Sequence, residues 1–346
     1  TREKPSLDMV LEKFDFRYFI KEYILVIKNK AFRRYFIMSL FYNTACNFYR
    51  SSLVFYIRYI ARLIRLYGIF TIIEGAAETS AFPFNYAMTM KHGKKKCSFV
   101  VTPLMILGFA VCLFMNPNDG NSSSIIWTII LMLSAIFYPF GKSGIGYTAT
   151  NIFPDISDID EAITGRRREG VIGTFNTLIK TCVSTTVQSL VLVILGRFGL
   201  VTGSEVTEYE KATGLLYDQP DSALFGVRLC VAIVPIAFTL ISLFLLHKFQ
   251  MNKSEHSLIR AAVATKHKYG SVALTEEQIK IVEKISGQKY ENTWLGKDND
   301  SDEAYTVEPD ENGEYQILID IEEEMKKICQ KKGEQNPDPA LHKMIF

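Results

Sequence analysis

Charged residues are scarce in this sequence, and long stretches lack them almost entirely. Asp, Glu, Lys and Arg make up only 22% of the 346 residues, whereas 48% are hydrophobic. Four runs are almost free of charge, at 99–115, 123–141, 183–196 and 229–246. Each approaches the ~20 apolar residues that span a bilayer. This composition excludes a water-soluble globular domain, a secreted disulfide scaffold and a nucleic-acid-binding protein.

The sequence also lacks the residue patterns of enzyme and metal chemistry. Its six cysteines show no CxxC or framework spacing, and its five histidines are scattered, so neither disulfides nor a metal site is expected. No GxxxxGK[ST], GxSxG or HExxH motif occurs. We therefore expect no catalytic residue and no resident cofactor. A membrane enzyme, the competing class, would need a reactive constellation that is not found.

The charges that are present divide the chain at Gln250. Residues 1–250 contain 26 Lys and Arg and 18 Asp and Glu. Residues 251–346 contain 13 Lys and Arg and 19 Asp and Glu, so the first part is basic and the second is acidic. Residues 1–35 alternate apolar and basic positions, which predicts an amphipathic helix in the membrane interface, with an ordinary surface helix as the alternative. Residues 36–250 form the predicted membrane domain. Residues 251–346 form an acidic cytoplasmic tail with short helices.

Six membrane spans are predicted, at 36–61, 66–90, 98–115, 124–149, 170–196 and 222–247. Basic residues accumulate in the short connections on the cytoplasmic side of a membrane. Here they precede the first span and follow the second, fourth and sixth, whereas the connection 116–122 has none; Arg62 and Arg65 run against the rule. Both ends of the chain are therefore predicted to be cytoplasmic.

Two short helices are predicted in the tail. Thr275 and Gln278 have the spacing of a capping box, and an apolar period follows as far as Ile285. A similar period runs from Tyr315 to Ile328, after an acidic connector.

Four charged residues fall at a similar depth in three of the predicted spans. Arg50 is in the first, Glu74 and Glu78 are in the second, and Lys180 is in the fifth. Glu74 and Glu78 share one helical face because they are four residues apart. Charges inside a membrane are costly to bury and usually face a cavity or one another. The sequence therefore predicts that these side chains, with Asn47, make a polar site near the midplane.

A purely structural alternative remains for this cluster. Arg50 and one glutamate could form a buried pair that only orients two helices. The polar site is favoured because Arg50 has hydrogen-bonding neighbours suited to a hydroxylated solute, namely Asn43, Thr44, Asn47 and Tyr49. Lys142, in the fourth span, is expected nearer a membrane surface, where its side chain can reach water.

The connection after the fourth span carries a specific motif. It reads Pro154-Asp155-Ile156-Ser157-Asp158-Ile159-Asp160-Glu161-Ala162-Ile163-Thr164-Gly165-Arg166-Arg167-Arg168-Glu169-Gly170. It resembles the cytoplasmic Asp-x-x-Asp, Thr-Gly-x-Arg-Arg-Glu-Gly signature of the glycoside-pentoside-hexuronide:cation symporters, the melibiose-permease-like branch of the major facilitator superfamily. The resemblance covers about 15–250. Further segments that agree with that family are Lys28 to Phe32, Gly93 to Lys96, Gln219-Pro220, Gly226-Val227-Arg228 and Pro235.

The resemblance implies a carrier of twelve spans in two halves, with solute and ion held between them. The segments matched here look like the second half, and Lys180 matches a family lysine associated with coupling between cation and sugar. The family's principal sugar- and sodium-binding acidic residues come from the first half, so no site for the implied Na⁺ or H⁺ carries over. Arg50, Glu74 and Glu78 have no counterpart in the family pattern.

The motif also has a reading from its charges alone. Asp155, Asp158, Arg167, Arg168 and Glu169 lie on either side of a predicted Thr164-Gly165 turn. Such groups could form ion pairs that close the cytoplasmic side in one state and open in another, which would make them a cytoplasmic gate. A plain charged loop that only holds the topology is the alternative.

These observations predict an all-α, polytopic membrane protein that is one half of a secondary transporter. The expected activity is symport of a sugar or glycoside with a cation by alternating access, in a lipid bilayer and with a first half fused upstream or supplied as a partner. The alternative is a non-transporting remnant or scaffold whose tail binds other proteins.

Overall fold

The computed structural model divides the chain into two compact units. One comprises residues 1–160 with 167–250, and the other comprises 161–166 with 251–346. The structure describes residues 23–24, 26–27, 29–114, 125–213, 217–248, 253–297, 299, 305–310 and 313–315.

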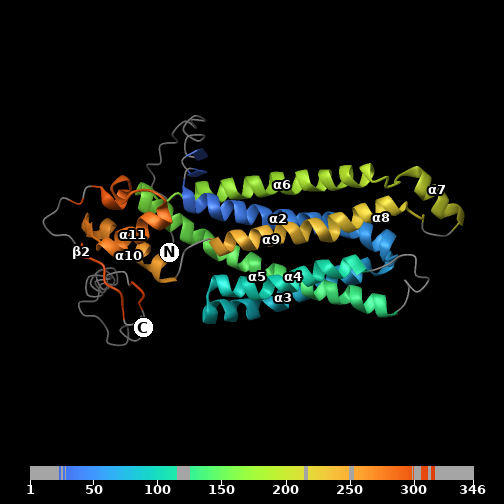
Figure 1. Cartoon of the computed structure of the whole chain (residues 1–346), viewed down its shortest axis with the longest axis horizontal. Helices are drawn as coiled ribbons and strands as arrows, with labels where there is room; N and C mark the ends of the chain where they lie inside the picture. Colours follow the sequence, from blue (N-terminus) through green and yellow to red (C-terminus); the bar gives the residue numbers. More distant parts are fainter. Residues whose placement is uncertain are drawn as a thin grey trace, which may run out of the picture. The chain divides into compact units, whose positions relative to one another are not determined.

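Long helices make up the first unit, as the all-helical prediction requires (Figure 1). Short helical turns follow or precede some of them, and two are π-helical. In chain order the elements are α2 (Lys30–Phe55), η1 (Tyr56–Ile60), η2 (Ile64–Leu66), α3 (Tyr67–His92), α4 (Lys94–Phe114), α5 (Ile125–Thr164), α6 (Glu169–Arg197), α7 (Ser204–Thr213), α8 (Asp221–Arg228), η3 (Leu229–Ile233) and α9 (Val234–Lys248).

Four stretches of the described chain are long and apolar enough to cross a membrane. They are Lys94–Phe114, Trp127–Thr164, Glu169–Arg197 and Asp221–Lys248. The helices α2 and α3 occupy the places expected for the first two spans, but they are not among these four. That six helices cross the membrane therefore stays a prediction.

The first long helix begins earlier than expected. It starts at Lys30 because the Asn29 side chain accepts hydrogen bonds from the backbone N–H groups of Ala31 and Phe32, which caps the helix. Four residues before this cap are described as helical, at 23–24 and 26–27. The rest of the predicted interfacial helix lies outside the described residues.

The helix α5 is much longer than the predicted span at 124–149. It continues through Pro154 and ends only at Thr164, where Gly165 adopts a left-handed conformation with φ of 69°. The acidic residues of the motif therefore lie on a helix and not in a loop, whereas the predicted turn at Thr164-Gly165 is present. Proline inside a membrane helix is tolerated when neighbouring groups satisfy the freed carbonyl.

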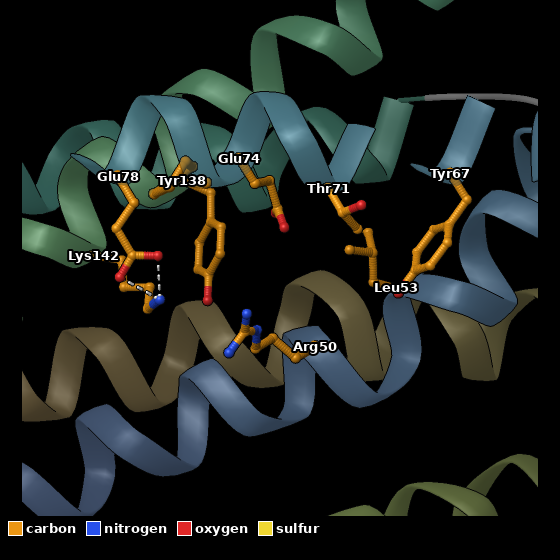
Figure 2. A pocket seen from close by; sticks show the side chains of 10 residues that line it. Arg50, Leu53, Tyr67, Thr71, Glu74, Glu78, Tyr138 and Lys142 are labelled. Carbon is orange, nitrogen blue, oxygen red and sulfur yellow. Dashed lines mark hydrogen bonds and ion pairs between the residues drawn. The ribbon is translucent and has the colours of Figure 1, made fainter. Parts of the chain in front are cut away.

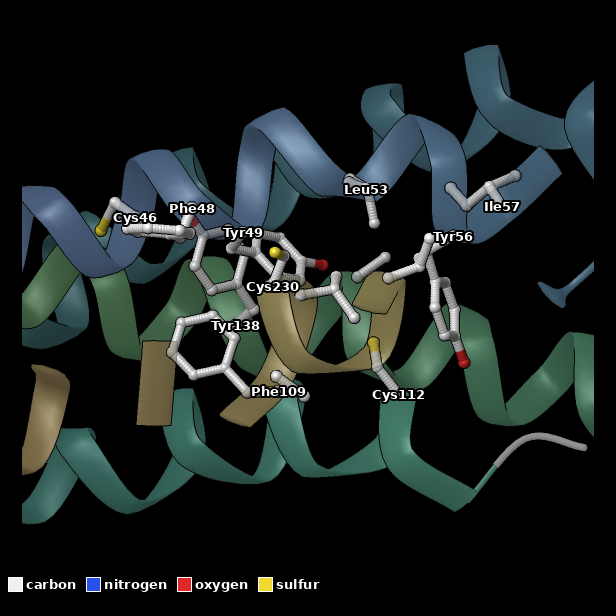
Figure 3. Close-up of a cluster of buried hydrophobic side chains, with 14 of the residues drawn as sticks. Cys46, Phe48, Tyr49, Leu53, Tyr56, Ile57, Phe109, Cys112, Tyr138 and Cys230 are labelled. Carbon is white, nitrogen blue, oxygen red and sulfur yellow. The ribbon is translucent and has the colours of Figure 1, made fainter. Parts of the chain in front are cut away.

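Close helix packing builds the interior of the first unit. Helices α2, α6 and α9 run alongside one another (Figure 1). Small residues let α4 and α5 touch: a Cβ added to Gly141 would lie 2.5 Å from the Met105 backbone nitrogen. Further along, the rings of Tyr49, Tyr138 and Phe109 pack together in the core (Figure 3).

The described residues of the tail form the helices α10 (Lys253–Tyr269) and α11 (Glu276–Ser286) and a two-stranded sheet within the second unit. The two helices are joined through β1 (Val272–Ala273), which pairs in parallel with β2 (Tyr305–Thr306). The 3-10 turns η4 (Tyr290–Asn292) and η5 (Trp294–Gly296) follow α11. The predicted helix and its capping box at Thr275 and Gln278 are confirmed. The helix predicted at 315–328 lies outside the described residues, apart from Tyr315.

Candidate solute site

A cavity of about 140 Å³ lies between α2, α3 and α5 in the first unit (Figure 2). Most of the residues around it are polar or charged, although the segments that supply them are largely apolar. Its lining consists of Arg50, Leu53, Tyr67, Thr71, Glu74, Gly75, Glu78, Tyr138, Pro139 and Lys142.

Helical periodicity explains why these side chains meet. Glu74 and Glu78 are one turn apart on α3, and Tyr138 and Lys142 are one turn apart on α5, so each pair shares a face of its helix. Figure 2 shows Glu74 and Tyr138 pointing into the space that Arg50 enters from α2. Three of the predicted site residues, Arg50, Glu74 and Glu78, are therefore brought together.

Lys142 and Glu78 form an ion pair on the cavity wall. The Lys142 Nζ donates to both carboxylate oxygens of Glu78, each at 2.6 Å. The Lys142 side chain is only 18% exposed. Lys142 was expected to extend its side chain to water, whereas here the side chain pairs with Glu78 on the cavity wall; its position near a membrane surface stays a prediction. Sequence reasoning left it out of the site.

Glu74 is held in place by the aromatic core. It is 9% exposed, and its Oε1 accepts a hydrogen bond of 3.3 Å from the Tyr49 hydroxyl. The ring of Tyr49 itself packs against Tyr138 and Phe109, with centroids 4.1 and 5.2 Å away. The Glu74 carboxylate keeps acceptor capacity toward the cavity, because each of its oxygens has two lone pairs.

Arg50 and Tyr138 present unused donors to the cavity. Within the described part of the chain, Arg50 makes no hydrogen bond and no ion pair, including to Glu74 or Glu78. The Tyr138 hydroxyl is buried and likewise lacks a hydrogen-bond partner there. Because the Tyr138 hydroxyl is buried, its unmade hydrogen bond costs about 1–3 kcal/mol. A bound molecule with hydroxyl or other polar groups would satisfy both donors.

The other two predicted site residues face a different neighbour. Asn47 on α2 accepts a hydrogen bond of 3.1 Å from the hydroxyl of Ser184, on α6. Lys180 lies one turn before Ser184 on α6, and no residue of α6 lines the cavity. The structure therefore does not place Asn47 and Lys180 on the cavity with Arg50.

Away from the cavity, a buried ion pair and a hydrogen bond connect three helices of this unit. Arg168, just before α6, donates to both carboxylate oxygens of Asp160 on α5, at 2.8 and 2.9 Å. The side chains are 9% and 1% exposed. The Asn29 amide, which caps α2, also donates to Asp160, at 3.3 Å. Asp160 thereby ties the starts of α2 and α6 to α5.

The other residues of the predicted gate have different partners. Asp155 accepts from Lys94 at the start of α4, at 2.6 Å, and Lys94 also donates to a backbone carbonyl of α5. Arg167 pairs with Glu169 at 3.3 Å, and both are exposed. Asp158 is half-buried on α5. Of the residues predicted to form a gate, Arg168 thus pairs with an acidic residue on the other side of the turn, Asp160, whereas Asp155 contacts α4. That they act as a gate stays a prediction.

The described residues contain no group of three His, Cys, Asp or Glu side chains placed to hold a metal ion.

Comparisons with known proteins show which family the chain belongs to. A protein of Synechocystis sp., named as an uncharacterized symporter, is 30% identical over 134 residues, which cover 38% of this chain and 23% of that protein. No solved structure matches significantly. Residues 16–253 match a family of membrane transporters, not of enzymes, which bind a small-molecule substrate in a lipid bilayer. Because that match covers more than half of the chain, this protein belongs to the family described as MFS/sugar transport protein.

Proposed function

We propose that this chain is the second half of a secondary transporter that carries a sugar or glycoside together with a cation by alternating access. The family match over 16–253 supports transport, and the symporter named among its relatives supports cation coupling. The matched residues cover less than a quarter of the length of that relative. The activity of a whole carrier, with a first half fused to this one or bound to it, is therefore part of the proposal.

The observation that carries this proposal is the polar cavity between α2, α3 and α5. Two basic and two acidic residues line it, so its formal charges cancel. A neutral, polyhydroxylated solute fits such a lining, because each hydroxyl both donates and accepts. Its hydroxyls would donate to Glu74 and accept from Arg50 and Tyr138. These three groups come from three helices, so the solute's contacts change when the helices move.

Coupling and orientation complete the proposal. We propose that Lys180 and Asn47, on the α2 and α6 side of the unit, act in coupling and not as cavity residues. Lys180 makes no hydrogen bond or ion pair with the described residues, which leaves its ammonium available to a group from the first half. We further propose that both ends of the chain are cytoplasmic and that Asp155, Asp158, Arg167, Arg168 and Glu169 belong to the cytoplasmic gate.

The direct test is uptake by the complete carrier in liposomes, with a panel of labelled glycosides and imposed sodium or proton gradients. A matched pair of threonines on α3 shows whether the cavity is the solute site. Thr71 and Thr79 both donate to a carbonyl of their own helix, at 2.8 and 2.9 Å, but only Thr71 lines the cavity. Thr71→Val should raise KM, whereas Thr79→Val should not. Equal effects would contradict the assignment, and no gradient-driven uptake of any glycoside would contradict sugar symport.

A further inference from the structure

The second compact unit contains more than the tail. It combines residues 251–346 with the six residues 161–166, which end α5 and begin the connection to α6. The family match ends at residue 253, so nearly all of the tail lies outside it. A tail that shares a compact unit with part of a transporter motif needs an explanation beyond the transport site.

A contact between a carboxylate and an imidazole is the first contact between the tail and this connection. The Oε1 of Glu161 lies 3.0 Å from the Nε2 of His267 on α10. The Glu161 side chain is 13% exposed, whereas His267 is 46% exposed. The acidic end of the motif is therefore largely covered.

The indole ring of Trp294 makes the second contact. A Cβ added to Gly165 would lie 2.6–2.7 Å from the Cδ1, Cγ and Nε1 atoms of Trp294, closer than real Cβ contacts allow. The imidazole of His267 packs on the same indole, with ring centroids 4.6 Å apart. Glu161, His267, Trp294 and Gly165 thus form one continuous contact, which we name the tail clamp.

A buried lysine keeps the clamp in its shape. Lys266 is 4% exposed, and its Nζ donates to the backbone carbonyls of Trp294 at 2.7 Å and Leu295 at 3.2 Å, and to that of Lys297. It also donates to the side chain of Asn299 at 3.0 Å. Four oxygens around one ammonium fix the Trp294 loop against α10, so the surface that meets Gly165 is preformed.

We propose that the tail clamp restrains the connection between α5 and α6 and thereby slows the conformational cycle. This step rests on the proposed transport function. Alternating access requires helices to change their relative positions. A contact made in one arrangement stabilises that arrangement and must open before the helices move. Releasing the clamp should therefore speed the cycle.

The contact itself is tested without any transport. The chain has two tryptophans, so Trp127→Phe leaves Trp294 as the sole tryptophan, whose emission can be excited selectively in the purified full chain. In that background Gly165→Ala should increase acrylamide quenching of Trp294 and speed hydrogen exchange in residues 161–169. The control is Gly203→Ala, which also has a positive φ, of 99°, but no atom within 4 Å of the added Cβ. Unchanged signals in Gly165→Ala, or equal changes in both variants, would overturn the proposal.

The restraint is tested on the complete carrier with His267→Ala, a change at a half-exposed residue that leaves the Lys266 contacts in place. Because the imidazole is half-exposed, loss of its contact with Glu161 predicts an initial uptake rate about two- to fivefold higher. KM should not change. A rate that stays the same or falls would overturn the restraint. If wild-type carrier moves no solute, the proposed function fails, whereas faster exchange of 161–169 in His267→Ala would still support the clamp and unchanged exchange would overturn it.

Discussion

Lys142 and Glu78 meet on the cavity wall with the lysine nitrogen 2.6 Å from each carboxylate oxygen. The pair links α5 to α3 and neutralises two of the four charges around the cavity. Its presence leaves Arg50 and Glu74 as the charged groups with capacity to spare. The pair thus acts as a structural brace beside the groups that we expect to contact a solute.

The brace predicts a measurable coupling between its partners. Glu78→Gln and Lys142→Gln should each lower the melting temperature in detergent, and the double variant should recover part of the loss. We expect a coupling of about 0.5–1 kcal/mol, because Glu78 is 41% exposed and water screens the pair. Lys96→Gln, at an exposed lysine on α4, is the control and should change little. Strictly additive losses would argue that the pair contributes nothing.

Tyr138→Phe should separate solute binding from stability. The ring keeps its packing on Tyr49 and Phe109, and the hydroxyl that is removed has no partner among the described residues. The melting temperature should therefore not fall, whereas KM should rise about two- to tenfold, the range of one lost neutral hydrogen bond.

Tyr42→Phe provides the opposite case. The Tyr42 hydroxyl donates to the Lys142 carbonyl at 2.8 Å, and the residue does not line the cavity. Its removal should cost about 0.5–1.5 kcal/mol of stability and leave KM unchanged. If the Tyr138→Phe variant had the wild-type KM, the Tyr138 hydroxyl would not contact the solute.

Adjacent arginines should differ sharply in their effect on stability. Arg168→Gln removes the positive charge that pairs with the buried Asp160 carboxylate, and breaking such a pair costs about 3–5 kcal/mol. Arg167→Gln removes only an exposed pair with Glu169, which is worth ~0–1 kcal/mol. Melting temperatures of the two purified variants give the comparison. Similar values would show that the Asp160 pair is not buried in solution.

A single methyl group should disturb the contact between α4 and α5. Gly141→Ala would place a carbon 2.5 Å from the Met105 nitrogen and 2.6 Å from its Cβ, so the helices must separate. Overpacking of this kind costs about 1–3 kcal/mol. Gly196→Ala, on α6 with nothing within 4 Å, should cause no loss. Melting temperatures of both variants in detergent give the comparison. If Gly141→Ala were as harmless as Gly196→Ala, the contact between α4 and α5 would tolerate the added methyl group.

The meeting of Arg50, Glu74 and Glu78 was predictable from the sequence, but the side of a helix on which a residue lies was only partly so. Counting residues placed Arg50, Glu74 and Glu78 at one level, and the four-residue spacing put the two glutamates on one face. The same count gave Lys180 a similar depth, yet α6 packs on the other side of α2 from the cavity. Which side a helix presents depends on its neighbours, and one sequence does not specify them.

Lys142 was not predicted to line the cavity, for a related reason. Its expected position near a membrane surface assumed that the fourth span ends at 149, whereas α5 runs to Thr164. Pro154 and the acidic residues after it favoured a loop, but contacts such as Lys94 with Asp155 hold that stretch against α4. Tertiary contacts thus extended a helix beyond the point where local sequence signals end it.

The length of α5 has a mechanical consequence. Its 40 residues measure about 60 Å at ~1.5 Å per residue, about twice the ~30 Å thickness of the hydrocarbon layer. Such a rod acts as a lever, because a tilt of about 10° around its centre displaces each end by roughly 5 Å. Small rotations beside Tyr138 and Lys142 would be amplified at Thr164, many turns away.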